Sequence, residues 1–166
     1  MDCGPTCLAM IVEYFGCDVN RDHLRECCAL GKDGVSLLGI SKAAETIGLK
    51  TIGGRTSFDS LTQEFPLPCI VHWNQNHFVV VHKIKKRKGL YSIYVADPSK
   101  GLMTYTKEEF CKHWISTQTD GIEKGIALLF EPTEYFYAQR GTETTTRGRI
   151  HFLWNYLRKY KRFFLQ

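Results

Sequence analysis

Two prolines, Pro66 and Pro68, divide the sequence into a part with helical patterning and a part with strand patterning. Before them, apolar residues recur at intervals of three and four, which is typical of helices with one buried face. After them, short runs of β-branched and aromatic residues alternate with polar turns, which is typical of antiparallel strands. A block of helices followed by a block of strands predicts an α+β fold, with N-terminal helices packed on an antiparallel sheet.

The helical part contains four expected helices. The first covers about residues 5–15 and stops at Gly16, and Pro5 suits its first turn because a proline nitrogen has no hydrogen to leave unpaired. Asn20 and Ser36 can cap the second and third helices, at about residues 20–29 and 37–47. The fourth, at residues 57–65, is ended by the two prolines.

The strand part contains expected strands at residues 69–73, 77–82, 91–96, 102–105 and 125–130. Between the last two, Thr106 and Glu109 have capping-box spacing and predict a helix that ends near Trp114. Residues 132–148 are rich in Thr and lack periodicity, so we expect a linker there. Residues 1–131 are therefore the expected domain, and residues 149–166 a separate element.

The positive charge of the chain is concentrated at its C-terminal end. Residues 147–166 hold six Lys or Arg and no acid, which leaves residues 1–146 with a net charge of −1 out of a total of +5. The body has no charge excess that would favour nucleic acid, and no such partner is expected. Residues 149–166 also carry many aromatic and aliphatic side chains. This combination suits an anionic membrane surface, and a helix packed on the domain is the alternative.

The cysteines favour reduced thiols over a disulfide framework, because their number is odd and no secretory signal precedes them. There are seven, none in a CxxC pair: Cys3, Cys7, Cys17, Cys27, Cys28, Cys69 and Cys111. Two i,i+4 pairs could face a zinc ion, Cys3 with Cys7 and His23 with Cys27. Without CxxC or HExxH spacing, we expect neither a metal ion nor another cofactor.

Three residues have the types and positions that a cysteine peptidase needs. Cys3 stands just before the first expected helix, where unpaired N–H groups and the helix dipole stabilise a thiolate. His77 opens one strand and Asp97 closes the next long strand, so antiparallel pairing can bring the imidazole and the carboxylate together. Each also has an ordinary alternative: a buried thiol, a turn histidine, and an Asx-turn aspartate before Pro98. Cys7, one helical turn further, is expected to pack as a small hydrophobe.

Taken together, these residues match a known pattern. The segment Asp-Cys-Gly-Pro-Thr-Cys-Leu-Ala-Met-Ile at residues 2–11 resembles the nucleophile motif of the C39 peptidases, papain-like cysteine peptidase domains of bacteriocin-exporting ABC transporters. Residues 77–81 resemble the catalytic-histidine strand of that family, residues 96–101 its Asp-Pro segment, and residues 34–39 the segment before its third helix. The resemblance covers roughly residues 2–131. It implies a papain-like fold with Cys3 as the nucleophile, His77 as the base and Asp97 as the residue that orients His77.

One residue of the family pattern has no counterpart. The family normally has a Gln six residues before the nucleophile, serving the oxyanion hole, whereas only Met1 and Asp2 precede Cys3. Losing one oxyanion donor costs about 10²–10³ in kcat. A truncated chain, a wrongly assigned start, and a weak peptidase that keeps leader binding are the alternatives. Gln75 or Asn76 could supply a substitute amide, although forming the turn before the histidine is their simpler role.

The resemblance also implies a function and partners. It implies removal of double-glycine-type leaders from bacteriocin-like precursor peptides, coupled to export through the membrane and ATPase domains of an ABC transporter. The implied location is the cytoplasmic face of the bacterial inner membrane. No Walker A sequence occurs, so the ATPase is not in this chain. A non-catalytic leader-binding module is the alternative function: the retained Cys3 argues against it, and the missing Gln argues for it.

Overall fold

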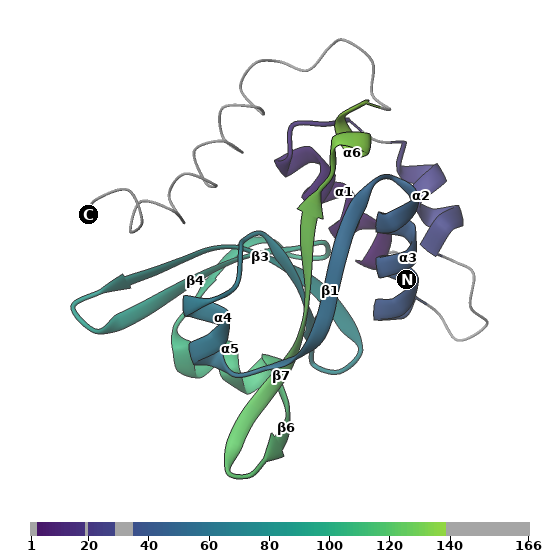
Figure 1. Cartoon of the computed structure of the whole chain (residues 1–166). Helices are drawn as coiled ribbons and strands as arrows, with labels where there is room; N and C mark the ends of the chain where they lie inside the picture. The colour runs from purple at the N-terminus through teal and green to yellow at the C-terminus, as the bar shows by residue number, and fades with distance from the viewer. Residues whose placement is uncertain (1–2, 19, 29–34, 139–166) are drawn as a thin grey trace, which may run out of the picture.

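The computed structural model of the chain describes residues 3–18, 20–28 and 35–138 (Figure 1). The expected basic segment, 149–166, and residues 139–148 of the expected linker lie outside the described residues. The elements follow one another as α1 (Cys3–Tyr14), α2 (Arg21–Cys28), α3 (Leu37–Thr46), β1 (Leu49–Thr56), α4 (Phe58–Gln63), β2 (Cys69–Trp73), β3 (His77–Arg87), β4 (Leu90–Asp97), β5 (Gly101–Tyr105), α5 (Lys107–Trp114), β6 (Ile115–Thr119), β7 (Ile122–Pro132) and α6 (Glu134–Ala138).

The strands form one antiparallel sheet in the order β1-β7-β2-β3-β4-β5, with β6 paired to β7. Helices α1, α2 and α3 gather in one layer beside it, while α4 and α5 lie within the curve of the sheet (Figure 1). The predicted α+β arrangement, with N-terminal helices on an antiparallel sheet, is confirmed.

The capping signals of the helices act where the sequence predicts them. Asn20 Oδ1 accepts the N–H of Asp22 at 2.9 Å at the start of α2, and Ser36 Oγ accepts the N–H of Gly39 at 3.0 Å at the start of α3. Thr106 forms the predicted capping box at the start of α5. These bonds satisfy N–H groups that have no partner inside the helix, so they fix where each helix begins.

The central strands are buried on both faces because helices cover both. One face packs with α1, α2 and α3 in a cluster that includes Ile70, Phe78, Val80, Leu128 and Phe130. The alternate residues face α4 and α5 in a second cluster that includes Val71, Trp73, Val79, Val81, Val95, Phe110 and Trp114. Period-two alternation of a pleated strand produces this division. The site described below lies at the end of the sheet where β3 begins and β4 ends.

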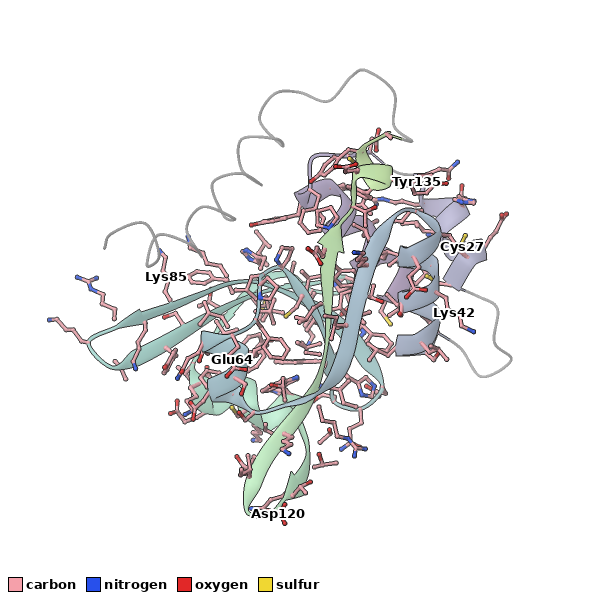
Figure 2. All side chains as sticks on the ribbon, viewed as in Figure 1. Cys27, Lys42, Glu64, Lys85, Asp120 and Tyr135 are labelled. Atoms are coloured by element: carbon pink, nitrogen blue, oxygen red, sulfur yellow. The ribbon has the colours of Figure 1, made fainter. Side chains whose placement is uncertain are left out.

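Two strands differ from the expectation. Strand β1 is longer than the short extended piece expected after Gly48, because eight residue pairs with β7 hold it despite its two glycines. Strand β6 was not expected, since its sequence is polar. The turn that joins β6 to β7 is Asp120-Gly121, with φ of 53° and 75°, at the tip of that hairpin in Figure 2. Asp-Gly with positive φ at both residues is a strong hairpin turn. It pairs β6 with β7 although the polar composition of β6 does not predict a strand.

The chain packs on the domain immediately after β7. Helix α6 lies within the stretch expected to be a linker, and its Phe136 is fully buried in the cluster formed by α1, α2 and α3. The Thr133 hydroxyl donates to the Gly48 carbonyl at 2.6 Å and joins this end to the loop after α3. The domain boundary after residue 131 stays a prediction. No described helix is long and apolar enough to cross a membrane.

Candidate active site

Cys3 is the first residue of α1, which begins about two residues earlier than the expected start at Pro5. The first N–H groups of a helix have no intrahelical acceptor, so backbone donors are available at this end of α1. Cys3 is 8% exposed and belongs to the same packed cluster as Phe78 and Ala96. These two residues are the chain neighbours of His77 and Asp97, and a hydrogen bond from Cys7 Sγ to the carbonyl oxygen of Phe78 holds the first turns of α1 at this end of the sheet.

His77 and Asp97 lie side by side. His77 is the first residue of β3 and Asp97 the last residue of β4, and antiparallel pairing of these strands places both at one end of the sheet. His77 Nε2 donates to Asp97 Oδ1 at 2.9 Å. Because a carboxylate only accepts, Nε2 must carry a hydrogen, which leaves Nδ1 as the ring nitrogen that can exchange a proton with a nucleophile.

Ser99 completes the environment of the carboxylate, and the sequence reasoning did not single it out. Its amide and its hydroxyl both donate to Asp97 Oδ1, at 2.8 and 2.7 Å. Burial would raise the pKa of Asp97, which is 2% exposed, but the hydrogen bonds from His77 and Ser99 outweigh burial and lower it. Asp97 is thus both the Asx-turn residue and the partner of His77, two roles that the sequence presented as alternatives. The Asp-Pro-Ser run is the signal that could have revealed Ser99.

Cys7 connects the helix layer to this end of the sheet. Its Sγ donates to the carbonyl oxygen of Phe78 at 3.3 Å, directly after His77. Burial, and then the negative charges of Cys3 and Asp97, raise the pKa of Cys7 well above its usual value. Cys7 is therefore a protonated, inert thiol. Cys3 lies one helical turn, about 5–6 Å, from Cys7 on the same face of the helix.

The charge of Asp97 raises the pKa of one side chain in each layer of the domain. Its charge reaches the Cys7 thiol in the helix layer, and with burial it also raises the pKa of Tyr105, which packs against the cluster under α4 and α5. Asp97 is the last residue of β4, at the end of the sheet that separates the two layers. Side chains from the start of α1 and from the strand ends can therefore converge on one place.

The turn before His77 is hydrogen-bonded to the end of α5. The Asn74 N–H donates to the His113 carbonyl at 2.9 Å, and the Asn74 side-chain oxygen lies 2.8 Å from His113 Nδ1. The ring of His113 stacks on Trp73 with centroids 5.0 Å apart. These contacts fix the chain that leads into His77. Gln75 and Asn76 lie exposed in this turn, and forming it is the simpler of the two roles that the sequence allowed them.

Side chains that could bind a metal ion do not cluster in the part of the chain that the structure describes. Within it, no group of three or more His, Cys, Asp or Glu side chains could hold a metal ion. His23 and Cys27 approach each other at 3.7 Å on α2, but as a pair they do not complete a tetrahedral zinc site.

Comparison with known proteins assigns the chain to a family. The sequence model of the Peptidase C39 family matches residues 1–120. The chain belongs to this family. Among solved structures, a double glycine motif protease from an AMS/PCAT transporter, in complex with the leader peptide, is 37% identical with a TM-score of 0.65, over 79% of this chain and 84% of that one. The peptidase domain of Streptococcus ComA, a bi-functional ABC transporter, is 25% identical with a TM-score of 0.62, over 80% of this chain and 92% of that one. The papain-like peptidase fold is confirmed.

Longer relatives contain a region similar to this C39 domain. The lactococcin-G-processing and transport ATP-binding protein LagD of Lactococcus lactis is 35% identical over 118 residues, which are 68% of this chain and 16% of the relative. The colicin V secretion/processing ATP-binding protein CvaB of Escherichia coli is 31% identical over 138 residues, 83% of this chain and 18% of the relative. The chain thus spans less than a fifth of the length of these relatives.

Proposed function

We propose that this chain is a cysteine endopeptidase domain that removes double-glycine-type leaders from precursor peptides. The observation that carries the proposal is the 2.9 Å hydrogen bond between His77 and Asp97, at the end of the sheet that the start of α1 approaches. This bond holds an imidazole with its Nδ1 available, which is what a thiol nucleophile needs as a base. Membership of the C39 family supports the same reaction class.

The proposed reaction divides peptide cleavage between three side chains. His77 Nδ1 takes the proton of the Cys3 thiol, and the thiolate attacks the carbonyl carbon of the residue before the scissile bond. Backbone N–H groups at the start of α1 stabilise the oxyanion that forms. His77 then gives the proton to the leaving amine as the C–N bond breaks, and activates the water that hydrolyses the acyl-enzyme. Asp97 keeps the ring oriented and stabilises its protonated form.

Cys7 is a poor candidate for the nucleophile although it lies in the same motif. It is fully buried, its thiol donates to a backbone carbonyl, and its pKa is raised well above the usual value. The thiolate is the reactive form of cysteine, so a thiol held protonated does not attack. The proposal therefore assigns attack to Cys3.

The relatives support the proposed substrate class and partners. One similar structure is a double glycine motif protease with its leader peptide, and the similar long proteins combine processing with ATP-dependent transport. We propose that the chain acts with the membrane and ATPase domains of an ABC transporter at the cytoplasmic face of the inner membrane.

The test is cleavage of a synthetic precursor whose leader ends in two glycines, followed by mass spectrometry. The proposal predicts a single cut after the second glycine. It predicts that Cys3→Ala abolishes the cut, while Cys7→Ala, the matched control one turn along the helix, retains it. Equal activity of the two variants would reject the assignment. Binding of the leader without cleavage, even after a Gln-containing segment is added upstream, would instead favour a leader-binding module.

A further inference from the structure

The hairpin of β3 and β4 carries a dense positive charge that the peptidase reaction does not use. It projects from the rest of the sheet, away from α1, α2 and α3 (Figure 1). No Asp or Glu occurs between Glu64 and Asp97, and five cations lie near its tip: Lys83, Lys85, Lys86, Arg87 and Lys88. The one acid of the hairpin, Asp97, is the last residue of β4, at the end opposite the tip, where it is bonded to His77.

Strand register places three of these cations on one face. Lys83, Lys85 and Arg87 pair across the hairpin with Tyr94, Ser92 and Leu90. Directly paired residues project to the same side of a sheet, so these six side chains share a surface. A register shift between Val81 and Lys83 separates this surface from the packed part of β3. We call it the basic hairpin face, made of Lys83, Lys85, Arg87, Leu90, Ser92 and Tyr94.

The basic hairpin face combines cations with apolar surface. The ammonium groups of Lys83 and Lys85 lie 5.6 and 5.7 Å from the centre of the Tyr94 ring, which gathers both charges over one aromatic side chain. Leu90, beside the tip, is 76% exposed. Among the residues that the structure describes, no carboxylate forms an ion pair with these cations.

We propose that the basic hairpin face binds the surface of a bilayer rich in anionic lipids. Lys and Arg attract anionic headgroups, each strengthening binding about fivefold near the surface, while Tyr and an exposed Leu enter the interfacial region. A projecting hairpin can reach a flat surface ahead of the domain. An acidic peptide or a nucleic acid would bind the Lys and Arg side chains of this face, but it would not bury the exposed Leu90 side chain. This inference does not depend on the peptidase chemistry.

Vesicle binding by the full chain tests the proposal. The hairpin triple is Lys83→Gln, Lys85→Gln and Arg87→Gln. The control triple removes three exposed cations elsewhere and changes the net charge equally: Lys42→Gln, Lys50→Gln and Lys112→Gln. Figure 2 shows Lys85 on the hairpin and Lys42 in the helix layer, on the other side of the molecule. Co-sedimentation uses phosphatidylglycerol–phosphatidylcholine vesicles, at the lipid concentration that binds half of the wild type, so that binding by residues 149–166 does not hide the difference.

The proposal predicts that the hairpin triple weakens vesicle binding tenfold or more, and that the control triple weakens it much less. Leu90→Ser should also weaken vesicle binding while leaving retention on a polyglutamate column unchanged. Equal losses in the two triples would overturn the proposal, because only net charge would then matter. The proposal would also be overturned if the hairpin triple bound vesicles as tightly as the wild type does. If that result came with lost polyglutamate binding, the face would be a site for an acidic peptide. Circular dichroism melting confirms that each variant is folded.

Discussion

Removing the Ser99 hydroxyl perturbs the environment of Asp97 and leaves the proposed reacting groups in place. This hydroxyl is one of three donors to Asp97 Oδ1, with the Ser99 amide and His77 Nε2. A hydrogen bond to a charged group contributes about 1.5–3 kcal/mol. Ser99 is itself exposed, so a water molecule can take over part of the bond. We therefore expect Ser99→Ala to lower the free energy of unfolding near the lower end of that range, by about 1.5 kcal/mol at neutral pH.

The loss should depend on pH in a defined direction. Burial acts to raise the pKa of Asp97, but the bonds from His77 and Ser99 prevail and lower it from its ordinary value of 3.8. A group with a lowered pKa contributes stability that is present above its unfolded pKa and is lost as the pH falls through its folded pKa. The difference between wild type and Ser99→Ala should therefore be constant from about pH 7 to pH 5 and shrink below about pH 4.

Urea unfolding followed by tryptophan fluorescence, repeated over this pH range, measures the difference. Ser99→Thr is the matched control, because threonine keeps both the hydroxyl and the amide, and it should remain within about 0.5 kcal/mol of wild type. Two results would refute the reasoning: an equal loss in the Thr and Ala variants, or a loss in Ser99→Ala that does not change with pH.

Three further predictions concern the packing that supports the site. Gly125→Ala would drive a methyl group into the Trp114 ring and should cost about 1–3 kcal/mol in urea unfolding, whereas Gly54→Ala, with open space around it, should cost nothing; equal effects would contradict the packing. Thr106→Ala removes the capping box of α5 and should cost about 1 kcal/mol, and a neutral result would contradict the cap. Burial raises the pKa of Cys69 to about 12, so native protein at neutral pH should not be alkylated there, as peptide mapping would show.

The fold could be predicted largely from local signals. Asn20, Ser36 and the capping box at Thr106 act within four residues of chain, so their hydrogen bonds could be read from the sequence. Strand β6 was missed because pairing with β7, rather than its own polar residues, makes it a strand. The Asp120-Gly121 turn is the local signal for this hairpin.

The three candidate residues could be proposed from the sequence, but the contacts that surround them could not. Cys3, His77 and Asp97 stand at element boundaries, where motif and spacing point to them. The double donation from Ser99 to Asp97 depends on the exact turn after β4, and the contacts between Asn74 and His113 join positions 39 residues apart. Such contacts are set by the packed fold, so single-sequence patterns could not supply them.

The central claim is that the Cys3 sulfur attacks the peptide with His77 as its base. The most direct measurement is mass spectrometry of protein quenched in acid during turnover of a double-glycine precursor. The account predicts a thioester between the leader fragment and Cys3, with slower formation of this adduct in His77→Ala. An adduct on Cys7 or on any other cysteine, or cleavage that persists in Cys3→Ala, would contradict it.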